Sequence, residues 1–265
     1  NGLLSKRYAK SRIKEIDWEK NNPKVKPGNP YKFQGGRKNP YQDYLKTWGE
    51  EKKRFNPNDG NQDFGAIETE FNTGTTTIQA ADKEGWVVSI TPSGGWIPTV
   101  IAGNTGVGLS QRAQSFVLYA DENPFNVIAP GKRPRATLTP ALAIKDGKPY
   151  LSFAVQGGDT QDQNLLQFFL NMVEFDMNVQ EATEAANVNS YQMYSSFGKH
   201  SKEAGRIVVQ EDIPPWVIKD LRKMGYNIQK RRLTSGPINA IWFDWEHNTM
   251  WGGSSNYGED YGIGW

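Results

Sequence analysis

The sequence predicts an α+β fold in which helices lie on the faces of a layered sheet. Two segments, 75–93 and 138–155, each contain a pair of strand-like runs joined by a short turn. Helical patterns follow at 161–174 and 178–187, and another helix and further strands complete the chain. Strands and helices grouped in blocks favour an α+β arrangement over a regular βαβ alternation. The 265 residues contain no internal repeat.

The first 74 residues are predicted to form one helix and a long arm. Residues 3–16 have helical apolar spacing, and Ser5 is a suitable N-cap. Residues 20–74 are rich in Asn, Pro, Gly, Lys and Asp, and they contain one candidate short helix at 41–54. A stretch this long without clear structure is unusual inside a compact domain. We therefore expect a linker or wrapping arm at 20–74.

Strand signals begin at Thr75. In TTTIQAAD, Ile78 and Ala80 alternate with Gln79 and Ala81 in a weak period-2 pattern. Lys83-Glu84-Gly85 is predicted to be a turn, and WVVSITPS a second strand. Asp146-Gly147 is a strong hairpin signal between two more predicted strands. The strands expected after the first hairpin are 114–120, 138–145, 149–155, 227–230 and 238–245.

Three helices are expected between and after these strands. Asn178 and Glu181 are spaced as a capping box at the start of 178–187. Pro214-Pro215 and Gly225 bracket another helix, with proline at its start and glycine after its end. The predicted buried face of helix 161–174 consists of Leu165, Leu166, Phe169, Met172 and Val173.

Composition excludes several kinds of chemistry. The chain has no cysteine, so disulfides, thiol catalysis and cysteine-based metal sites are excluded. Only two histidines are present, His200 and His247, and their spacing is not that of metal ligands. So few histidines offer little support for a Ser-His-Asp triad. The net charge is +2, and the basic residues of the first 74 positions are dispersed, which argues against a nucleic-acid partner. No apolar run is long enough for a membrane span, and no metal site is predicted.

Thr75 is the strongest candidate for a nucleophile. It follows Gly74 and a polar linker, and it stands at the head of a predicted strand. A threonine released at its own N-terminus has a hydroxyl nucleophile and an α-amine that serves as its base. In a chain that is poor in histidine, such an amine is an economical general base.

Several blocks, taken in order, resemble the γ-glutamyltranspeptidase family, a branch of the N-terminal-nucleophile hydrolases. The resemblance covers most of the chain except the long linker, and it is closest to the acylase-like members. The blocks are LLSKRYAKSRIKEID near the start, Thr75-Thr76-Thr77, Asp82, Gly85, Ser89-Ile90-Thr91, Gly131-Lys132-Arg133-Pro134 running on to Pro140, Gly157-Gly158, and Gly252-Gly253-Ser254-Ser255.

This resemblance implies a layered αββα sandwich and three segments. Residues 1–19 resemble the last helix of the family's large subunit, 20–74 form the linker before the processing site, and 75–265 form a small-subunit-like catalytic domain. The implied partners are the remainder of the large subunit and a small-molecule amide or peptide substrate. No cofactor is implied, and family analogy suggests a periplasmic or secreted protein.

The family mechanism implies roles for individual residues. Thr75 Oγ would attack an amide carbonyl, and self-cleavage at Gly74–Thr75 would first release its α-amine. Gly157 and Gly158 would donate backbone N–H groups to the oxyanion. Thr91 and Ser93 would orient the nucleophile.

Departures from the family pattern indicate a changed substrate. Thr77 stands where the family usually has histidine, and Ala136-Thr137 replaces a Ser-Ser pair that holds the glutamyl α-carboxylate. Gly95, Arg112 and Ser115 occupy the positions that read the glutamyl α-amine. Arg112 would repel an ammonium, so we expect the substrate-binding residues Arg112, Ser115 and Thr137 to accept a different acyl group, such as one with a carboxylate.

Two other functions remain open. The chain could be an unprocessed, catalytically silent relative that acts as a binding or structural subunit. Alternatively, Trp242, Trp245 and Trp251, together with the acids Asp244 and Glu246, could belong to a carbohydrate-binding or glycan-cleaving module.

Overall fold

The main sheet is four-stranded and antiparallel. This computed structural model describes residues 1–36, 38–47, 74–94, 100–198, 200–256 and 260–264. The sheet has the order β3-β4-β8-β9. Its strands are β3 (Ala141–Lys145), β4 (Lys148–Val155), β8 (Ile238–Asp244) and β9 (Thr249–Ser254). Asp146 and Gly147, both with positive φ, form the predicted tight turn between β3 and β4.

Helices α4 (Gln161–Val173) and α5 (Val179–Glu184) pack against one face of this sheet. Alternate residues of β4, namely Leu151, Phe153 and Val155, point toward Phe168 and Met172 of α4 in one apolar core. The capping box of Asn178 and Glu181 forms at the start of α5, as the sequence predicts.

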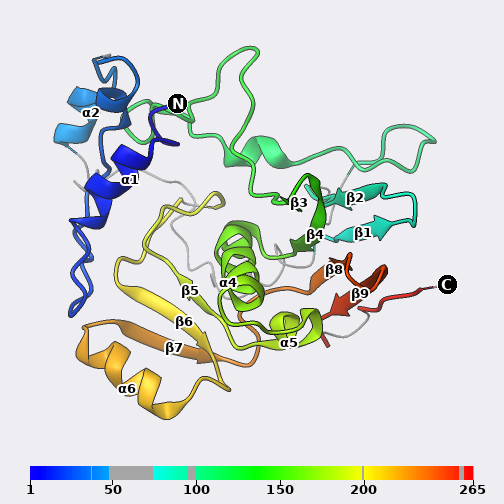
Figure 1. The fold of residues 1–265 in the computed structure, drawn as a ribbon. Coiled ribbons are helices and arrows are strands. Elements are labelled where there is room, and N and C mark those ends of the chain that lie inside the picture. Colours follow the sequence, from blue (N-terminus) through cyan, green and yellow to red (C-terminus); the bar gives the residue numbers. More distant parts are fainter. Residues whose placement is uncertain (37, 48–73, 95–99, 199, 257–259, 265) are drawn as a thin grey trace.

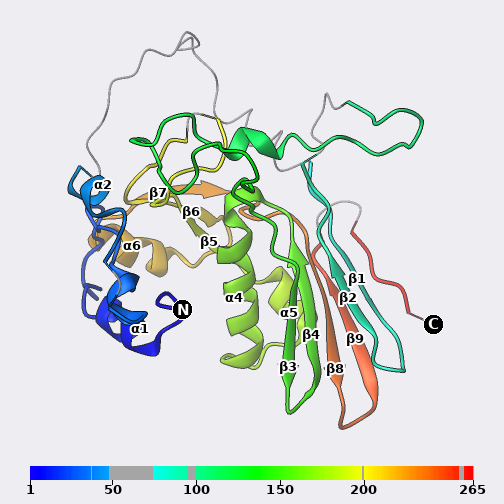
Figure 2. The ribbon, with the colours of Figure 1, turned by 90° about the horizontal axis from the view of Figure 1, so that it is seen from above.

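The opposite face of the main sheet carries a hairpin of β1 (Ile78–Ala81) and β2 (Val87–Ile90). Strand β2 contacts β4, and β1 contacts β8. Figure 2 shows the resulting order of layers from helices to main sheet to hairpin. The described residues therefore form an α+β fold with helix, sheet and hairpin layers.

A smaller sheet lies beside the main one (Figure 1). Strands β5 (Val188–Ser190) and β6 (Arg206–Gln210) pair antiparallel, and β6 pairs in parallel with β7 (Asn227–Arg231). Helix α6 (Pro215–Lys223) connects β6 to β7, and its Ile218 packs on Ile207 and Val209.

The N-terminal segment lies along one side of the molecule (Figure 1). Ser5 caps α1 (Lys6–Ile13), as predicted. After η1 (Pro30–Phe33) and α2 (Gln42–Lys46), residues 48–54 of the expected helix lie outside the described residues. Tyr44 donates a hydrogen bond of 2.8 Å to the carbonyl oxygen of Glu122, so this arm contacts the rest of the chain.

Two predictions about local structure are wrong. Residues 114–120 form no strand; Arg112–Ser115 is a short 3-10 helix, η2, and Val117 makes only an isolated bridge with Val127. The segment has no neighbouring strand beyond that bridge, so its backbone bonds go to turns. In α4, Leu166 is 59% exposed, whereas Phe168 fills the core. The helix presents Leu165, Phe168 and Met172 at intervals of three and four residues, which leaves Leu166 on the opposite side.

Truncating Phe168 and Leu166 of α4 one at a time should show that only Phe168 contributes to the core. Phe168→Ala leaves a cavity beneath β4 and is expected to lower the free energy of unfolding by about 3–5 kcal/mol. Leu166→Ala, at the exposed position two residues earlier, is expected to change the free energy of unfolding by no more than about 0.5 kcal/mol. Denaturant unfolding followed by circular dichroism measures both. Equal losses in the two variants would contradict this packing.

Candidate active site

Thr75 and Ser93 meet just beyond the ends of the β1–β2 hairpin. The two residues form an isolated antiparallel bridge, and the Thr76 N–H donates to the Pro92 carbonyl oxygen at 3.2 Å. Their hydroxyl oxygens lie 2.7 Å apart, within hydrogen-bond distance. Thr75 is only 6% exposed. The hairpin therefore holds the predicted nucleophile against one of its two predicted orienting residues.

Arg112 joins this pair from η2. Its Nη2 donates to Ser93 Oγ at 3.3 Å, and its Nη1 donates to Thr137 Oγ1 at 3.0 Å. Burial lowers the pKa of the Arg112 guanidinium from its ordinary value, while the Asp159 carboxylate raises it. An arginine remains charged at neutral pH in either case. The Ser93 hydroxyl therefore lies between Thr75 and the positive charge of Arg112.

The predicted oxyanion residues follow strand β4. Gly157 has φ 133° and Gly158 has φ 54°, a region that favours glycine. The Gly157 carbonyl oxygen accepts from the Thr160 N–H at 3.0 Å and from Thr160 Oγ1 at 2.9 Å. Within the described part of the chain, neither the Gly157 nor the Gly158 N–H makes a hydrogen bond. These two N–H groups are thus suited to donate hydrogen bonds to a ligand oxygen.

Residues 194–197 connect the glycine loop to Arg112. Asp159 Oδ2 accepts from the Ser196 N–H at 2.6 Å, and Ser196 Oγ donates to Asp159 Oδ1. The Phe197 ring lies below the Arg112 guanidinium, 5.7 Å from its carbon to the ring centroid. A Cβ atom added to Gly158 would stand 3.1 Å from this ring. Sequence reasoning missed Asp159, Ser196 and Phe197, although Asp159 directly follows the glycine pair.

The other predicted site residues lie deeper or elsewhere. Thr91 is 6% exposed, and its hydroxyl has no hydrogen-bond partner among the described residues, so no bond joins it to Thr75. Ser115 is fully buried, and its carbonyl oxygen accepts from the Asn126 side chain, so Ser115 lies beneath the surface of the site. Gly95 lies outside the described residues. Thr77 donates to Asn239 Oδ1 of β8 and ties the start of the hairpin to the main sheet.

The tryptophan-rich region forms no flat platform. Trp242 and Trp251 have ring centroids 6.2 Å apart, but their planes are inclined at 49°. Trp245 stacks on Phe243 and donates to the Pro149 carbonyl oxygen at 2.6 Å. Asp244 accepts from the Glu246 and His247 N–H groups and closes the β8–β9 turn. These contacts give the Asp244 carboxylate a structural role, and they provide no support for a glycan-cleaving pair.

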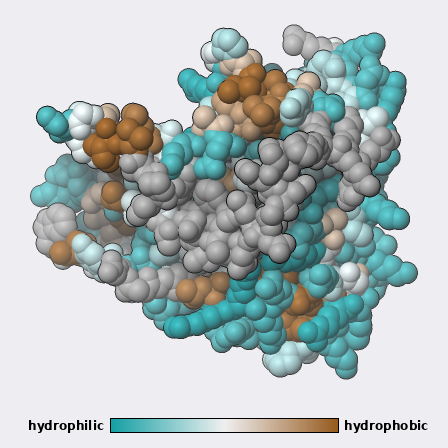
Figure 3. Space-filling model, turned by 180° about the vertical axis from the view of Figure 1, so that it is seen from behind, coloured by the Kyte–Doolittle hydropathy of each residue, from teal (hydrophilic) through white to brown (hydrophobic). Residues whose placement is uncertain are grey.

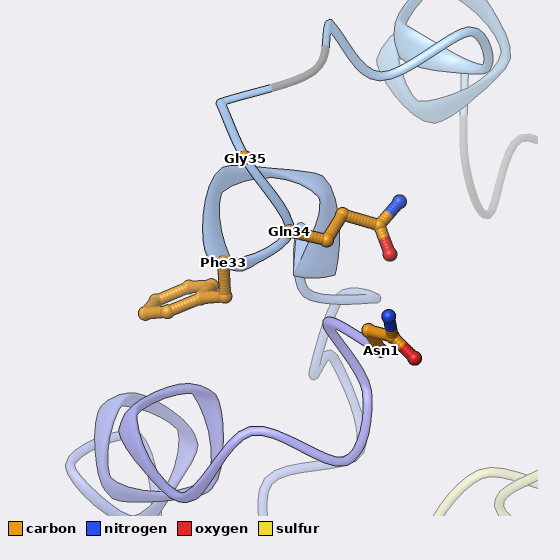
Figure 4. Close-up of a pocket in the computed structure, with 4 residues that line it drawn as sticks. All are labelled: Asn1, Phe33, Gln34 and Gly35. Carbon is orange, nitrogen blue, oxygen red and sulfur yellow. The ribbon is translucent and has the colours of Figure 1, made fainter.

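A surface cavity near the N-terminus is separate from this site. It is lined by Asn1, Phe33, Gln34 and Gly35, as Figure 4 shows, and it contains none of the predicted catalytic residues.

Across the described ranges, no group of three or more His, Asp or Glu side chains is arranged to hold a metal ion. Over the same ranges, no helix is both long and apolar enough to cross a membrane.

Comparison with known proteins gives one consistent family. The γ-glutamyltranspeptidase family profile matches residues 1–265. The glutathione hydrolase proenzyme of Bacillus subtilis (strain 168) is 28% identical over 271 aligned positions, which cover 99% of this chain and 40% of the relative. This chain thus spans well under half the length of that relative.

Solved structures share the fold. The cephalosporin acylase from Bacillus halodurans aligns with a TM-score of 0.68 and 24% identity, over 97% of this chain and 38% of its own. A chain of the γ-glutamyltranspeptidase from Pseudomonas nitroreducens aligns with a TM-score of 0.58 and 22% identity, over 71% of this chain and 98% of its own.

Loss of the Asp159 carboxylate should loosen residues 194–197. Asp159→Ala removes the charged acceptor of the Ser196 N–H, a bond worth roughly 1.5–3 kcal/mol. Hydrogen–deuterium exchange at Ser196 should become at least about 10-fold faster, since 1.4 kcal/mol corresponds to that factor. Asp162→Ala, a nearby exposed aspartate, serves as the control and should leave this exchange unchanged. Unaltered exchange in Asp159→Ala would show that the loop does not depend on this contact.

Proposed function

Because the chain belongs to the γ-glutamyltranspeptidase family, we propose that it is the nucleophile-bearing part of an N-terminal-threonine amidohydrolase or acyltransferase. The contact between Thr75 Oγ1 and Ser93 Oγ at the end of the hairpin carries this proposal. It places a buried threonine hydroxyl beside a hydrogen-bonding partner, next to the ends of two paired strands and directly after a glycine. Such an arrangement suits a nucleophile that is exposed by cleavage before it.

In the proposed reaction, Thr75 Oγ attacks an amide carbonyl while the Thr75 α-amine takes the hydroxyl proton. The N–H groups of Gly157 and Gly158 stabilise the oxyanion, a contribution of about 3 kcal/mol for each well-placed donor. The carbon–nitrogen bond then breaks, and the leaving amine receives the proton. Water or an acceptor amine attacks the resulting ester and frees Thr75.

Self-cleavage is the step that creates the α-amine. Thr75 is bonded to Gly74 in the intact chain, so its nitrogen is an amide without basicity. We propose that Thr75 Oγ attacks the Gly74 carbonyl, and that hydrolysis of the resulting ester separates residues 1–74 from 75–265. The Pseudomonas nitroreducens alignment supports this division, because it covers almost all of that relative's chain and 71% of this one, a share similar to residues 75–265.

The charge of Arg112 argues against a γ-glutamyl substrate. An α-ammonium near this guanidinium would experience repulsion that Ser93 and Thr137 cannot offset. A carboxylate at the same place would form a charge-assisted hydrogen bond. We therefore propose an acyl group with an anionic end, with Thr137 holding Arg112 in position. The buried Ser115 supports this site from below.

The outer face of the hairpin indicates what completes the fold. Ile78, Val88 and Ile90 point away from the main sheet and are 43–50% exposed, whereas Gln79 and Ser89 point toward it. We propose that the remainder of the large subunit covers this apolar face and adds the second helical layer of the αββα sandwich. Residues 1–19 would then belong to that subunit and residues 20–74 would be the linker. By family analogy, we propose a periplasmic or secreted location.

Maturation provides the first test. Wild-type full-length protein should yield a polypeptide that begins at Thr75, as determined by intact mass and N-terminal sequencing. Thr75→Ala should remain uncut and inactive, because it lacks the attacking oxygen. Thr76→Ala, which changes the exposed neighbour of Thr75, should still be cut at Gly74–Thr75. An uncut wild-type chain after prolonged incubation would favour the alternative, a catalytically silent binding subunit.

Substrate preference provides the second test. We expect glutaryl-p-nitroanilide to be hydrolysed with a kcat/KM at least about 10-fold above that of γ-glutamyl-p-nitroanilide, in line with one charge-assisted bond. Arg112→Gln should reduce or reverse this preference, because it removes the positive charge while keeping a hydrogen-bonding side chain. Turnover of glutathione or the γ-glutamyl anilide equal to that of the glutaryl anilide would contradict the assignment.

A further inference from the structure

Phe197 contacts both halves of the candidate site. Its ring faces the Arg112 guanidinium at 5.7 Å, within the range of a cation–π interaction. A ring-edge carbon, Cε2, stands 3.1 Å from the place where a Gly158 side chain would begin. One half-buried aromatic ring therefore fills the space between the cationic group and the proposed oxyanion loop.

Hydrogen bonds hold the backbone that precedes Phe197. The preceding residue, Ser196, is buried and bonded through its N–H and hydroxyl to Asp159. Arg135 donates to the Tyr194 carbonyl oxygen at 2.9 Å and lies 3.4 Å from the Asp159 carboxylate. These contacts link the position of the ring to the loop that contains Gly157 and Gly158. The ring is therefore placed beside the glycine loop by its neighbours in the chain.

The charges around this ring sum to a positive value. Arg112 and Arg135 contribute two positive charges, and Asp159, which pairs with Arg135, contributes one negative charge. The face of the ring directs its negative quadrupole at the Arg112 guanidinium, which favours one orientation of that group. The net local charge remains positive and suits an anionic ligand.

We propose that Phe197 determines acyl specificity by orienting Arg112 for the carboxylate end of the acyl group and by limiting the space beside Gly158. This proposal rests on the proposed function of Arg112 as the anion-binding residue. Phe197 acts on the anion through Arg112, so it is a positioning residue for charge recognition. Its contact with Gly158 makes it at the same time a steric limit on acyl groups that are branched near the carbonyl.

Equilibrium binding of glutarate to the mature full-length protein tests this role without requiring turnover. Calorimetry should show that Phe197→Leu, which keeps an apolar side chain but removes the ring, weakens glutarate binding about 5-fold, consistent with a partly buried cation–π contact. Phe197→Tyr keeps the ring and should remain within about 2-fold of wild type. Phe175→Leu, at an exposed phenylalanine outside the site, is the matched control.

Turnover supplies an independent readout. Phe197→Leu should raise KM for glutaryl-p-nitroanilide while leaving kcat, and the KM of neutral pentanoyl-p-nitroanilide, nearly unchanged. Equal binding in the Leu and Tyr variants, or no measurable glutarate binding by wild type, would overturn the proposal. Selective glutarate binding without any amide hydrolysis would sustain the role of Phe197 but refute the proposed enzyme activity. Amide hydrolysis without selective glutarate binding would sustain the proposed enzyme activity but refute the role of Phe197.

Discussion

Two side-chain hydrogen bonds attach the β1–β2 hairpin, which follows Thr75, to the main sheet. Thr77 bonds to Asn239, and Ser152 bonds to Gln79 across the same interface. Hydrogen bonds are directional, so this interface fixes the register of the hairpin on the sheet more narrowly than apolar contact alone would. The positions of Thr75 and Ser93 depend on that register, and Arg112 in turn bonds to Ser93.

The remaining parts of the site are arranged around this fixed point by two loops. Gly157 and Gly158 adopt backbone conformations that few other residues tolerate, at the end of a strand buried in the core. Asp159 then connects the glycine loop to residues 194–197, which lie far along the chain. The site thus combines a rigid sheet edge with loops that are held by a few charged contacts.

Local sequence patterns predicted the elements well where one residue type decides the conformation. Asp146-Gly147 and the capping residue Asn178 are such cases, because a turn or cap depends on neighbouring residues only. Local sequence patterns do not predict an element correctly where tertiary contacts determine its conformation. Residues 114–120 have a strand-like composition but no strand to pair with, and β6 was not recognised although its apolar residues are buried. Thr75, Ser93 and Arg112 are site residues predicted from the sequence that the structure brings together, whereas Phe197 has no local sequence signal and reaches Arg112 only through the folded loop.

The apolar outer face of the hairpin bears on the order of events in the proposed maturation. A two-stranded ribbon is only marginally stable alone, and this one presents Ile78, Val88 and Ile90 on its outer face, where they are 43–50% exposed. In the proposed assembly, covering these three side chains adds hydrophobic free energy that stabilises the hairpin. The proposal therefore couples the geometry around Thr75 to completion of the outer layer. Such coupling would act as a checkpoint, because a chain that has not assembled would lack a firmly held nucleophile.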